Sequence, residues 1–468
     1  MKSNSDALIS IPPKGLAFLT LVGPSFIWCA EYIGSGEVIL ATRTGAILGN
    51  SIIWAVALGI FLKYWIGLSG ARYTVCTGEG MIDMFDRIPG PSHWVVGIVL
   101  VAQFISAAIS IGSIASAAGI FLSSLLPISP YLAGWSVTIF CVTVVWSSLF
   151  NLLKIVMSLF VLIIIIGVMY VAIKAFPGFS VFLKSFLINI PDVPNWAITK
   201  AGINQNPWRE VLPLLGWGAG GFASQVWYTY WVLGAGYGAA KNRGYGKPAD
   251  LKMLINITKT GAEKIKGWCR VVYADATIAM IIGNTVTIGF LISGAGILGP
   301  KELAPKGEEV ATTLATIFSS QWGALGGFLF LMSATIALIG TQIGQLAGWP
   351  RLLADAFRIC VPWFQKTFRW QIQFRIFLIF FLLTNMVIVY SFGLKPVIIV
   401  QAGAIMDGLL LTPLQAIWVA IGLYYIMPKM FNKEAWNIIK PHWVFAIGLI
   451  VAFIVFGYFC VFQIPYLF

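Results

Sequence analysis

Charge is scarce in this sequence: only 10% of the 468 residues are Asp, Glu, Lys or Arg, while 59% are hydrophobic. That balance excludes an ordinary water-soluble domain and is typical of a protein that crosses the membrane several times. Histidine is scarcer still, with His93 and His442 alone, each at the end of an apolar run and near a proline. We expect both to cap helices or to lie at the membrane interface, and not to bind metal.

Motifs for catalysis and for cofactor binding are missing as well. The sequence has no nucleotide-binding loop, no nucleophile beside a base and no histidine cluster, so we expect neither an enzyme nor a bound cofactor. Its six cysteines are scattered without the spacing of a metal site and are expected to be free thiols. The short polar N-terminal segment does not resemble a cleaved signal peptide, and it leads directly into the first apolar run.

Apolar runs long enough to cross a bilayer recur along the whole chain. They predict an all-α integral membrane protein with about eleven transmembrane helices, which form a single domain over residues 1–468 within the lipid bilayer. The expected spans are residues 17–44, 50–71, 94–120, 131–150, 154–175, 210–238, 271–296, 322–347, 374–392, 396–427 and 443–465.

Basic residues are in excess, and the formal net charge is +13. Most of the 30 Lys and Arg residues, with Lys63 counted among them, are assigned to the same side of the expected membrane as the N-terminus. Because positive residues gather on the cytoplasmic side, this predicts a multi-pass protein of the plasma (inner) membrane with a cytoplasmic N-terminus and an external C-terminus. The charge is thus a signal of topology, and no nucleic-acid partner is expected.

The first apolar run is interrupted by polar residues and glycine. Residues 23–50 read GPSFIWCAEYIGSGEVILATRTGAILGN, with two carboxylates in the middle. A charged side chain at the bilayer centre costs at least about 2.5 to 3.5 kcal/mol on insertion scales. Non-helical backbone at this depth survives only where protein or a water-filled cavity satisfies its polar groups, so we expect a break that forms part of a substrate site. The residues predicted for this part of the site are Glu31, Gly34, Ser35, Gly36 and Glu37.

A second interruption occurs in the sixth run, where residues 214–221 read LLGWGAGG. Such dense glycine does not favour a helix, since each Gly in a helix interior costs roughly 1 kcal/mol relative to Ala. Interrupted helices at matching positions in two halves are typical of transporters built as inverted repeats, with the substrate between the breaks. Glycine for close helix packing is the alternative. The residues predicted to contact substrate here are Trp217, Gly218, Gly220, Gly221 and Phe222.

Three further polar side chains lie inside expected spans. Gln342 belongs to the eighth span, and Gln401 and Asp407 belong to the tenth. An intramembrane carboxylate is a functional candidate by default. We expect all three side chains to face the two breaks; for Asp407, a structural ion pair with a Lys or Arg is the alternative.

Several segments, taken in order, resemble the natural resistance-associated macrophage protein (NRAMP) family of divalent-metal transporters. GPSF, EYIGSGEV and GAILG resemble the first helix of that family, ARYTVCTGEG its next loop, RVVYADATIAMIIGN its seventh helix and IGTQIGQLAG its eighth. The resemblance implies a leucine-transporter-type fold with helices 1 and 6 interrupted. It also implies two inverted repeats of five helices, here 17–175 and 210–427, followed by an extra helix at 443–465.

The resemblance does not extend to the family's metal-binding residues. Aligned without gaps, the family's metal-binding Asp falls on Gly34, its Asn on Glu37 and its sixth-helix Met on Gly220. A thioether favours transition metals over hard cations, so its loss predicts a harder selectivity. The acidic residues of the family's proton path correspond to Ser106 and Ile109. The chain therefore looks like a divergent member of the family with a non-matching metal-binding site.

These features predict a secondary transporter that moves a small cation by alternating access. The resemblance favours a divalent metal ion, held by Glu37 and Glu31 as hard oxygen ligands. An organic amine or amino acid is the alternative substrate, because its ammonium group would bind a carboxylate and the nearby aromatic rings. A non-transporting membrane sensor or scaffold is the second alternative, and its sign would be a site closed by side chains such as a Glu37–Arg43 ion pair.

Overall fold

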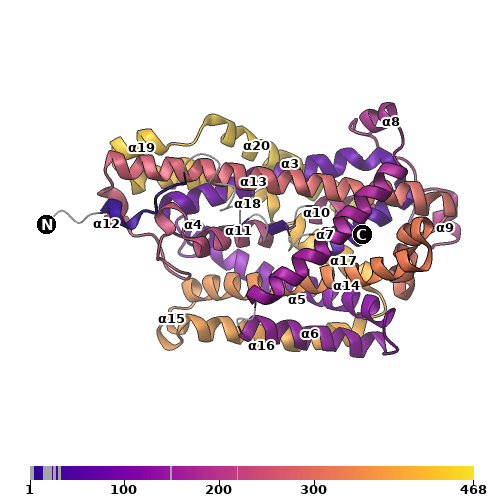
Figure 1. The fold of residues 1–468 in the computed structure, drawn as a ribbon. Coiled ribbons are helices and arrows are strands. Elements are labelled where there is room, and N and C mark those ends of the chain that lie inside the picture. The colour runs from indigo at the N-terminus through magenta and orange to yellow at the C-terminus, as the bar shows by residue number, and fades with distance from the viewer. Residues whose placement is uncertain are drawn as a thin grey trace.

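The computed structural model of the chain describes residues 5–13, 24, 28–29, 33–147, 150–218 and 220–467, with backbone alone for 5, 150–161 and 467. All regular secondary structure within these ranges is helical (Figure 1). The all-α prediction is therefore confirmed for the described part of the chain.

The helices range from single turns to stretches longer than a membrane is thick. In chain order they are α2 (Thr42–Leu48), α3 (Ile53–Thr77), α4 (Met81–Asp86), α5 (Trp94–Ser123), α6 (Pro130–Ser147), α7 (Phe150–Lys174), α8 (Phe179–Lys184), α9 (Asn195–Thr199), α10 (Trp208–Trp217), α11 (Phe222–Ala235), α12 (Leu251–Ile255), α13 (Lys259–Ser293), α14 (Val310–Cys360), α15 (Pro362–Thr367), α16 (Trp370–Phe392), α17 (Pro396–Gly408), α18 (Thr412–Ile421), α19 (Lys433–Ile439) and α20 (Trp443–Tyr458). A short π-helix, Gly36–Ala41, directly precedes α2. α14 is two helices joined at a kink, because Trp322 and Gly323 have non-helical backbone angles.

Eight helical stretches among the described residues are long and apolar enough to cross a membrane, judged by length and composition alone. They are Gly36–Thr77, Trp94–Ser123, Pro130–Ser147, Lys259–Lys301, Gly307–Cys360, Trp370–Phe392, Pro396–Met430 and Trp443–Tyr466. By this measure three helices are too short to span a membrane: α10, α11 and the part of α7 from Leu162 to Lys174, whose side chains are described. The number of eleven transmembrane helices therefore stays a prediction.

The two halves of the sixth apolar run lie in the middle of the bundle. Figure 1 shows α10 and α11 between α3 and α13 on one side and α5 and α14 on the other. α11 packs against α3 and α14, while α10 packs against α3 and α17. The residues of α11 from Phe222 to Leu233 are all buried. A helix that is apolar all round is a buried helix, so this region forms the interior from which the site is built.

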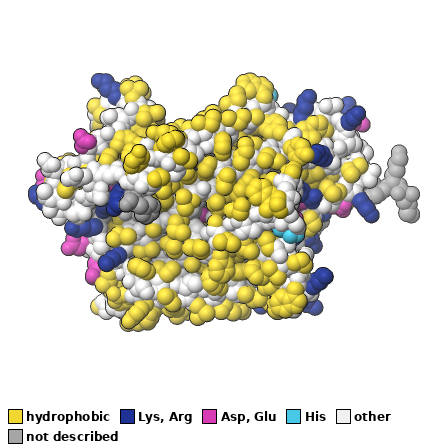
Figure 2. Space-filling view, turned by 180° about the vertical axis from the view of Figure 1, so that it is seen from behind, with side chains coloured by type: hydrophobic (Ala, Val, Ile, Leu, Met, Phe, Trp, Pro, Cys, Tyr) yellow, Lys and Arg dark blue, Asp and Glu magenta, His cyan; other side chains and the backbone are white. Residues whose placement is uncertain are grey.

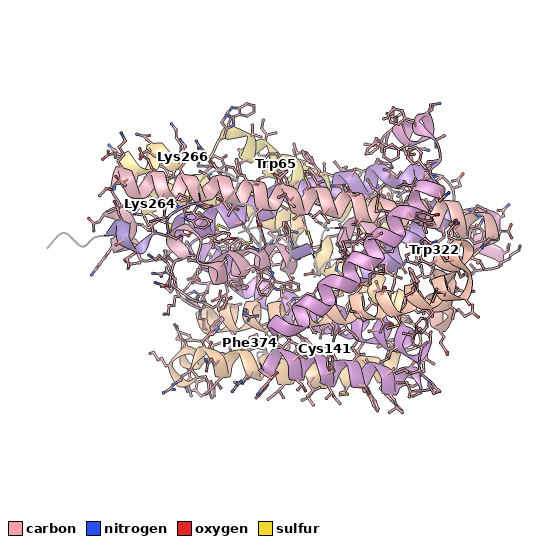
Figure 3. The ribbon with its side chains drawn as sticks, in the orientation of Figure 1. Trp65, Cys141, Lys264, Lys266, Trp322 and Phe374 are labelled. Carbon is pink, nitrogen blue, oxygen red and sulfur yellow. The ribbon has the colours of Figure 1, made fainter. Side chains whose placement is uncertain are left out.

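The face shown in Figure 2 carries a broad hydrophobic band, with charged side chains gathered at its two ends. Large apolar side chains such as Val101, Leu383 and Val387 are more than 60% exposed. An apolar surface of this extent fits contact with lipid and not with water. Figure 3 shows Lys264 and Lys266 at one end of the molecule and Trp322 toward the other.

The two histidines lie at helix starts, as expected from the sequence. The His442 side chain accepts a hydrogen bond from the Val444 backbone N–H at the first turn of α20. His93 immediately precedes α5, and its Nδ1 lies 2.6 Å from Asp86 Oδ1. The expectation that they cap helices is confirmed for His442, and His93 occupies the equivalent position of α5.

Candidate functional site

The sixth apolar run folds as two helices separated by a short non-helical segment. α10 ends at Trp217 and α11 begins at Phe222. Gly220 has a φ of +71°, a conformation that L side chains rarely adopt, and Gly221 has an extended backbone. These glycines let the chain leave one helix and start the next while its backbone stays inside the protein.

A buried lysine from α3 satisfies the carbonyl groups that this segment exposes. The last carbonyls of a helix have no partner within that helix. The Lys63 side chain is fully buried, and its ammonium group is surrounded by backbone oxygens. Lys63 Nζ donates hydrogen bonds to the carbonyl oxygens of Leu215 (2.9 Å), Gly218 (3.1 Å) and Gly220 (2.8 Å), and to that of Gly216. The assignment of Lys63 to the cytoplasmic side was wrong, because its amine finds its partners in the interior.

The turn at Ile33 and Gly34 in the first apolar run, called the first break below, is supported by a carboxylate of its own segment. Ile33 and Gly34 form a turn, and helical backbone resumes with Gly36–Ala41. The Gly34 backbone N–H donates to Glu37 Oε2 at 3.2 Å, and the Thr287 hydroxyl on α13 donates to Glu37 Oε1 at 3.5 Å. Glu37 is fully buried. Its carboxylate thus faces the turn and α13.

Glycines bring the first break into direct contact with its neighbours. A Cβ atom at Gly34 would overlap Thr341 Oγ1 on α14. A Cβ atom at Gly36 would lie 3.2 Å from the backbone oxygen of Trp217, at the end of α10. The first contact leaves no room for a Cβ atom and the second would be tight with one, so the glycines of EYIGSGEV place the first break against the second and against α14.

Asp407, on α17, lies beside the start of α11. Its Oδ1 accepts hydrogen bonds from the Ala223 backbone N–H (3.3 Å) and from Gln103 Nε2 (3.1 Å). A Cβ atom at Gly221 would overlap Asp407 Oδ2. The start of a helix carries a partial positive charge that stabilises a carboxylate. Among the described residues Asp407 forms no ion pair with Lys or Arg, so the structural ion pair is not formed there.

A small cavity lies between the two breaks, α14 and α17. It is lined by Ser35, Gly36, Trp217, Gly220, Gly221, Trp227, Thr341, Gln345, Trp349 and Asp407. The space inside holds little more than one water molecule or an ion of similar size. Thr341 Oγ1, Gln345 Oε1 and Trp227 Nε1 are buried without a hydrogen-bond partner in the described part of the chain. Because buried polar atoms are normally paired, these atoms suit a small polar guest.

The structure brings six of the thirteen predicted site residues together at this cavity. The predicted residues that line it are Ser35, Gly36, Trp217, Gly220, Gly221 and Asp407. Gly34, Glu37, Gly218 and Phe222 belong to the two breaks but not to the lining. Gln342 is fully buried on α14, and neither atom of its amide has a partner among the described residues.

The two remaining predicted residues are Gln401 and Glu31. Gln401 lies apart from it, where its Nε2 donates to Glu210 Oε2 at 3.1 Å. Glu31 lies outside the described residues, so its predicted role as a metal ligand stays a prediction. Within the described ranges there is no group of three or more His, Cys, Asp and Glu residues that could hold a metal ion.

Sequence reasoning missed Lys63, Gln103 and Trp349. Gln103 links two of the site's groups, since it donates to Asp407 and accepts from Trp349 Nε1 at 2.8 Å. The available signal was a lysine in the middle of the apolar run 50–71 and a glutamine within the run 94–120. Polar residues inside a span are functional candidates by default, and that rule applied to both.

A buried ion pair lies on one side of the cavity. Arg43 donates to both carboxylate oxygens of Glu210 at 2.8 Å, and to the Pro305 backbone oxygen at 2.5 Å. The sequence-based alternative of a Glu37–Arg43 pair is wrong, because Arg43 reaches across to α10. Glu210 precedes Trp217 by seven residues, which is about 10 Å along the helix axis.

A second buried network lies on the opposite side. Arg358 NH2 contacts both Asp83 and Asp355 at 2.6 Å, and the Tyr230 hydroxyl donates to Asp355 at 2.9 Å. Burial, together with the neighbouring Asp355 carboxylate, raises the pKa of Asp83 on the short helix α4. Tyr230 follows Phe222 by eight residues, about 12 Å beyond the break. The cavity therefore lies between two buried ionic networks.

Comparison with known proteins gives one local sequence match and extensive structural matches. No family model matches the chain. The chain is 32% identical over 100 residues to the divalent metal cation transporter MntH of Yersinia enterocolitica, an alignment that covers 19% of this chain and 24% of that protein. This chain thus spans only about a quarter of the length of the curated relatives it matches.

Two solved structures share the fold. A manganese transporter of Eremococcus coleocola, in complex with an aromatic bis-isothiourea-substituted compound, matches 96% of this chain and 88% of its own with a TM-score of 0.63 and 14% identity. MhsT in complex with L-phenylalanine matches 95% of this chain and 99% of its own with a TM-score of 0.53 and 13% identity.

Fold and surface together define the class: an all-α membrane protein with the fold of solved transporters, in agreement with the expected leucine-transporter-type fold. The local identity to MntH and the match to the manganese transporter support the resemblance to the NRAMP family.

Proposed function

We propose that this chain is a secondary transporter that moves a small cation by alternating access, and that the cation binds in the cavity between the two helix breaks. The observation that carries this proposal is the lining of the cavity. It combines the Asp407 carboxylate with the unpartnered oxygens of Thr341 and Gln345, in a space that fits one small ion. Oxygen ligands suit hard cations, while soft transition metals favour sulfur and nitrogen.

The substrate class proposed here is a divalent metal ion, by analogy with the metal transporters that the chain resembles. No Met, Cys or His occurs among the described residues that line the cavity. We therefore expect the site to prefer harder cations than a site with a thioether ligand does, and Mg²⁺ is the ion to test beside Mn²⁺.

The proposed architecture has eleven spans with helices 1 and 6 interrupted. Two inverted repeats, 17–175 and 210–427, are followed by the extra helix 443–465. The N-terminus is cytoplasmic and the C-terminus external. Two contacts support the placement of the two termini on opposite sides of the membrane. Ser10 donates to Gly236 O (3.0 Å) beyond the end of α11, while Asn206, just before α10, donates to Tyr466 O (3.2 Å).

The two buried ionic networks are the proposed gates. Arg43 and Glu210 join α2 to α10 on one side of the cavity, and Arg358 joins α14 to α4 on the other. Alternating access requires that one side opens while the other stays closed, so each network has to break during half of the cycle. Because both networks are buried, separating one charged side chain from its partner is costly. Each network is therefore expected to open all at once.

Calorimetric titration of the purified protein tests the substrate class. Mn²⁺, Mg²⁺ and Ca²⁺ are titrated first, followed by a panel of amines and amino acids. We expect saturable binding of a divalent ion that weakens at least about tenfold in Asp407→Asn. The matched control is Glu302→Gln, which removes an exposed carboxylate paired with Lys200 far along the chain. Heat from an organic ligand without any from metal would contradict the proposal and favour the organic-amine alternative.

A further inference from the structure

Lys63 occupies a ring of backbone oxygens that resembles the binding site of a free cation. The carbonyl oxygens of residues 215, 216, 218 and 220 all accept hydrogen bonds from its Nζ. The Phe456 ring on α20 faces the same nitrogen, with its centroid 5.9 Å away. Among the described residues, every hydrogen-bond partner of Nζ is therefore a carbonyl oxygen, and an aromatic face lies nearby.

This surrounding suits a positive charge. A lysine ammonium has three N–H donors and no acceptor, whereas a neutral amine would point a lone pair at the oxygens. The oxygens of Leu215 and Gly216 belong to the end of α10, where the helix dipole is negative, and those of Gly218 and Gly220 follow directly after it. Rings of backbone carbonyls are also the groups with which channels replace the hydration shell of a monovalent cation. The same geometry would therefore accept a free monovalent cation if the amine were absent.

The geometry points to a monovalent-cation site at the sixth-helix break, which the chain fills with its own Lys63 ammonium group. Removal of that group lets a soluble cation bind between the same carbonyls, with Na⁺, K⁺ or a small alkylammonium ion as the chemical class. The intact protein consequently needs no soluble monovalent cation at this position. This inference concerns the break itself and does not depend on which substrate the cavity takes.

The test measures the thermal unfolding temperature of full-length Lys63→Ala in detergent. Chloride salts of Na⁺, K⁺, methylammonium and ethylammonium are added at constant ionic strength, with N-methyl-D-glucamine as the cation too large for the site. We expect the variant to unfold well below wild type and to regain several degrees, saturably, with at least one of the four small cations, because a ligand that binds only the native state raises its stability. Wild type is expected to respond equally to all five salts.

Lys63→Met is the matched control. Its side chain also lacks charge but fills the space, so its unfolding temperature falls without any rescue by small cations. Lys366→Ala removes an exposed lysine and is expected to behave as wild type. The inference is overturned if Lys63→Ala responds to the small cations no more than to N-methyl-D-glucamine.

Failure of Lys63→Ala to fold still gives a decision. Recovery of folded protein only from buffers that contain a small cation supports the inference. If none is recovered under any condition, Lys63→Met decides: an unfolding temperature close to that of wild type would mean that the carbonyl ring needs no cation, and a large fall would mean that it does.

Discussion

At each of the two helix breaks a buried side chain satisfies exposed backbone groups, but an acceptor serves the first break and a donor serves the second. At the first break an exposed backbone N–H, that of Gly34, is satisfied by the carboxylate of Glu37, three residues away in the same segment. At the second break exposed carbonyl oxygens are satisfied by the ammonium group of Lys63, which comes from α3. Unsatisfied backbone groups at membrane depth each cost several kcal/mol, so a break persists only with such a partner. The exposed N–H of the first break thus has an acceptor side chain, and the exposed carbonyl oxygens of the second break have a donor side chain.

The comparison predicts unequal costs, because one side chain serves four groups and the other serves one backbone N–H. Lys63→Met leaves the carbonyls of the second break without a donor inside the protein, and breaking a buried charge partnership typically costs about 3 to 5 kcal/mol. We expect the largest fall in thermal unfolding temperature for this variant. A change within a degree or two of wild type would mean that the break does not depend on the lysine.

The contact between the second break and Asp407 is the next to test. In Gly221→Ala the new Cβ would overlap Asp407 Oδ2, so the carboxylate has to move, at a cost of about 1 to 3 kcal/mol. We expect a lower unfolding temperature and weaker binding of the divalent ion in calorimetric titration. Gly457→Ala is the control, since a Cβ there meets nothing within 4 Å. Equal binding by both variants would separate Asp407 from the site.

The backbone strain at the second break has a smaller expected effect. Gly220 has a positive φ, and a side chain in that conformation costs about 1 to 2 kcal/mol. Gly220→Ala is therefore expected to lower the unfolding temperature by a few degrees. Gly97→Ala on α5, where a Cβ would meet no atom within 4 Å, is expected to be neutral or slightly stabilising. The reverse order of the two variants would argue against a strained break.

Glu37→Gln tests the contribution of the Glu37 side chain to the stability of the first break. The amide oxygen of glutamine still accepts the hydrogen bond from Gly34, so about 1 kcal/mol or less is lost. Glu37→Leu, which removes the acceptor, is expected to cost more, about 1 to 3 kcal/mol. Thermal unfolding of the pair separates the hydrogen bond from the charge, and a larger loss in the glutamine variant than in the leucine variant would contradict this account.

The positions of the Ile33–Gly34 turn and of the non-helical residues before Phe222 were predictable from the sequence, because glycine density and intramembrane charge are local signals. LLGWGAGG and EYIGSGEV locate the segments that line the cavity. Partners were harder to predict, since they depend on which helices pack together. Arg43 lies six residues from Glu37 in sequence, yet it pairs with Glu210 on α10. Lys63 was assigned to the cytoplasmic side together with most other basic residues, although its side chain is buried in the interior of the protein.

Uptake of divalent ions into proteoliposomes tests the central claim most directly, because it measures movement of the proposed substrate through the proposed site. We expect saturable uptake of Mg²⁺ or Mn²⁺ with the wild-type protein and with Glu302→Gln, and a loss of at least about tenfold with Asp407→Asn. Uptake by wild type no greater than that of protein-free vesicles, or equal uptake by wild type and Asp407→Asn, would contradict the assignment of this cavity as the path of a divalent cation.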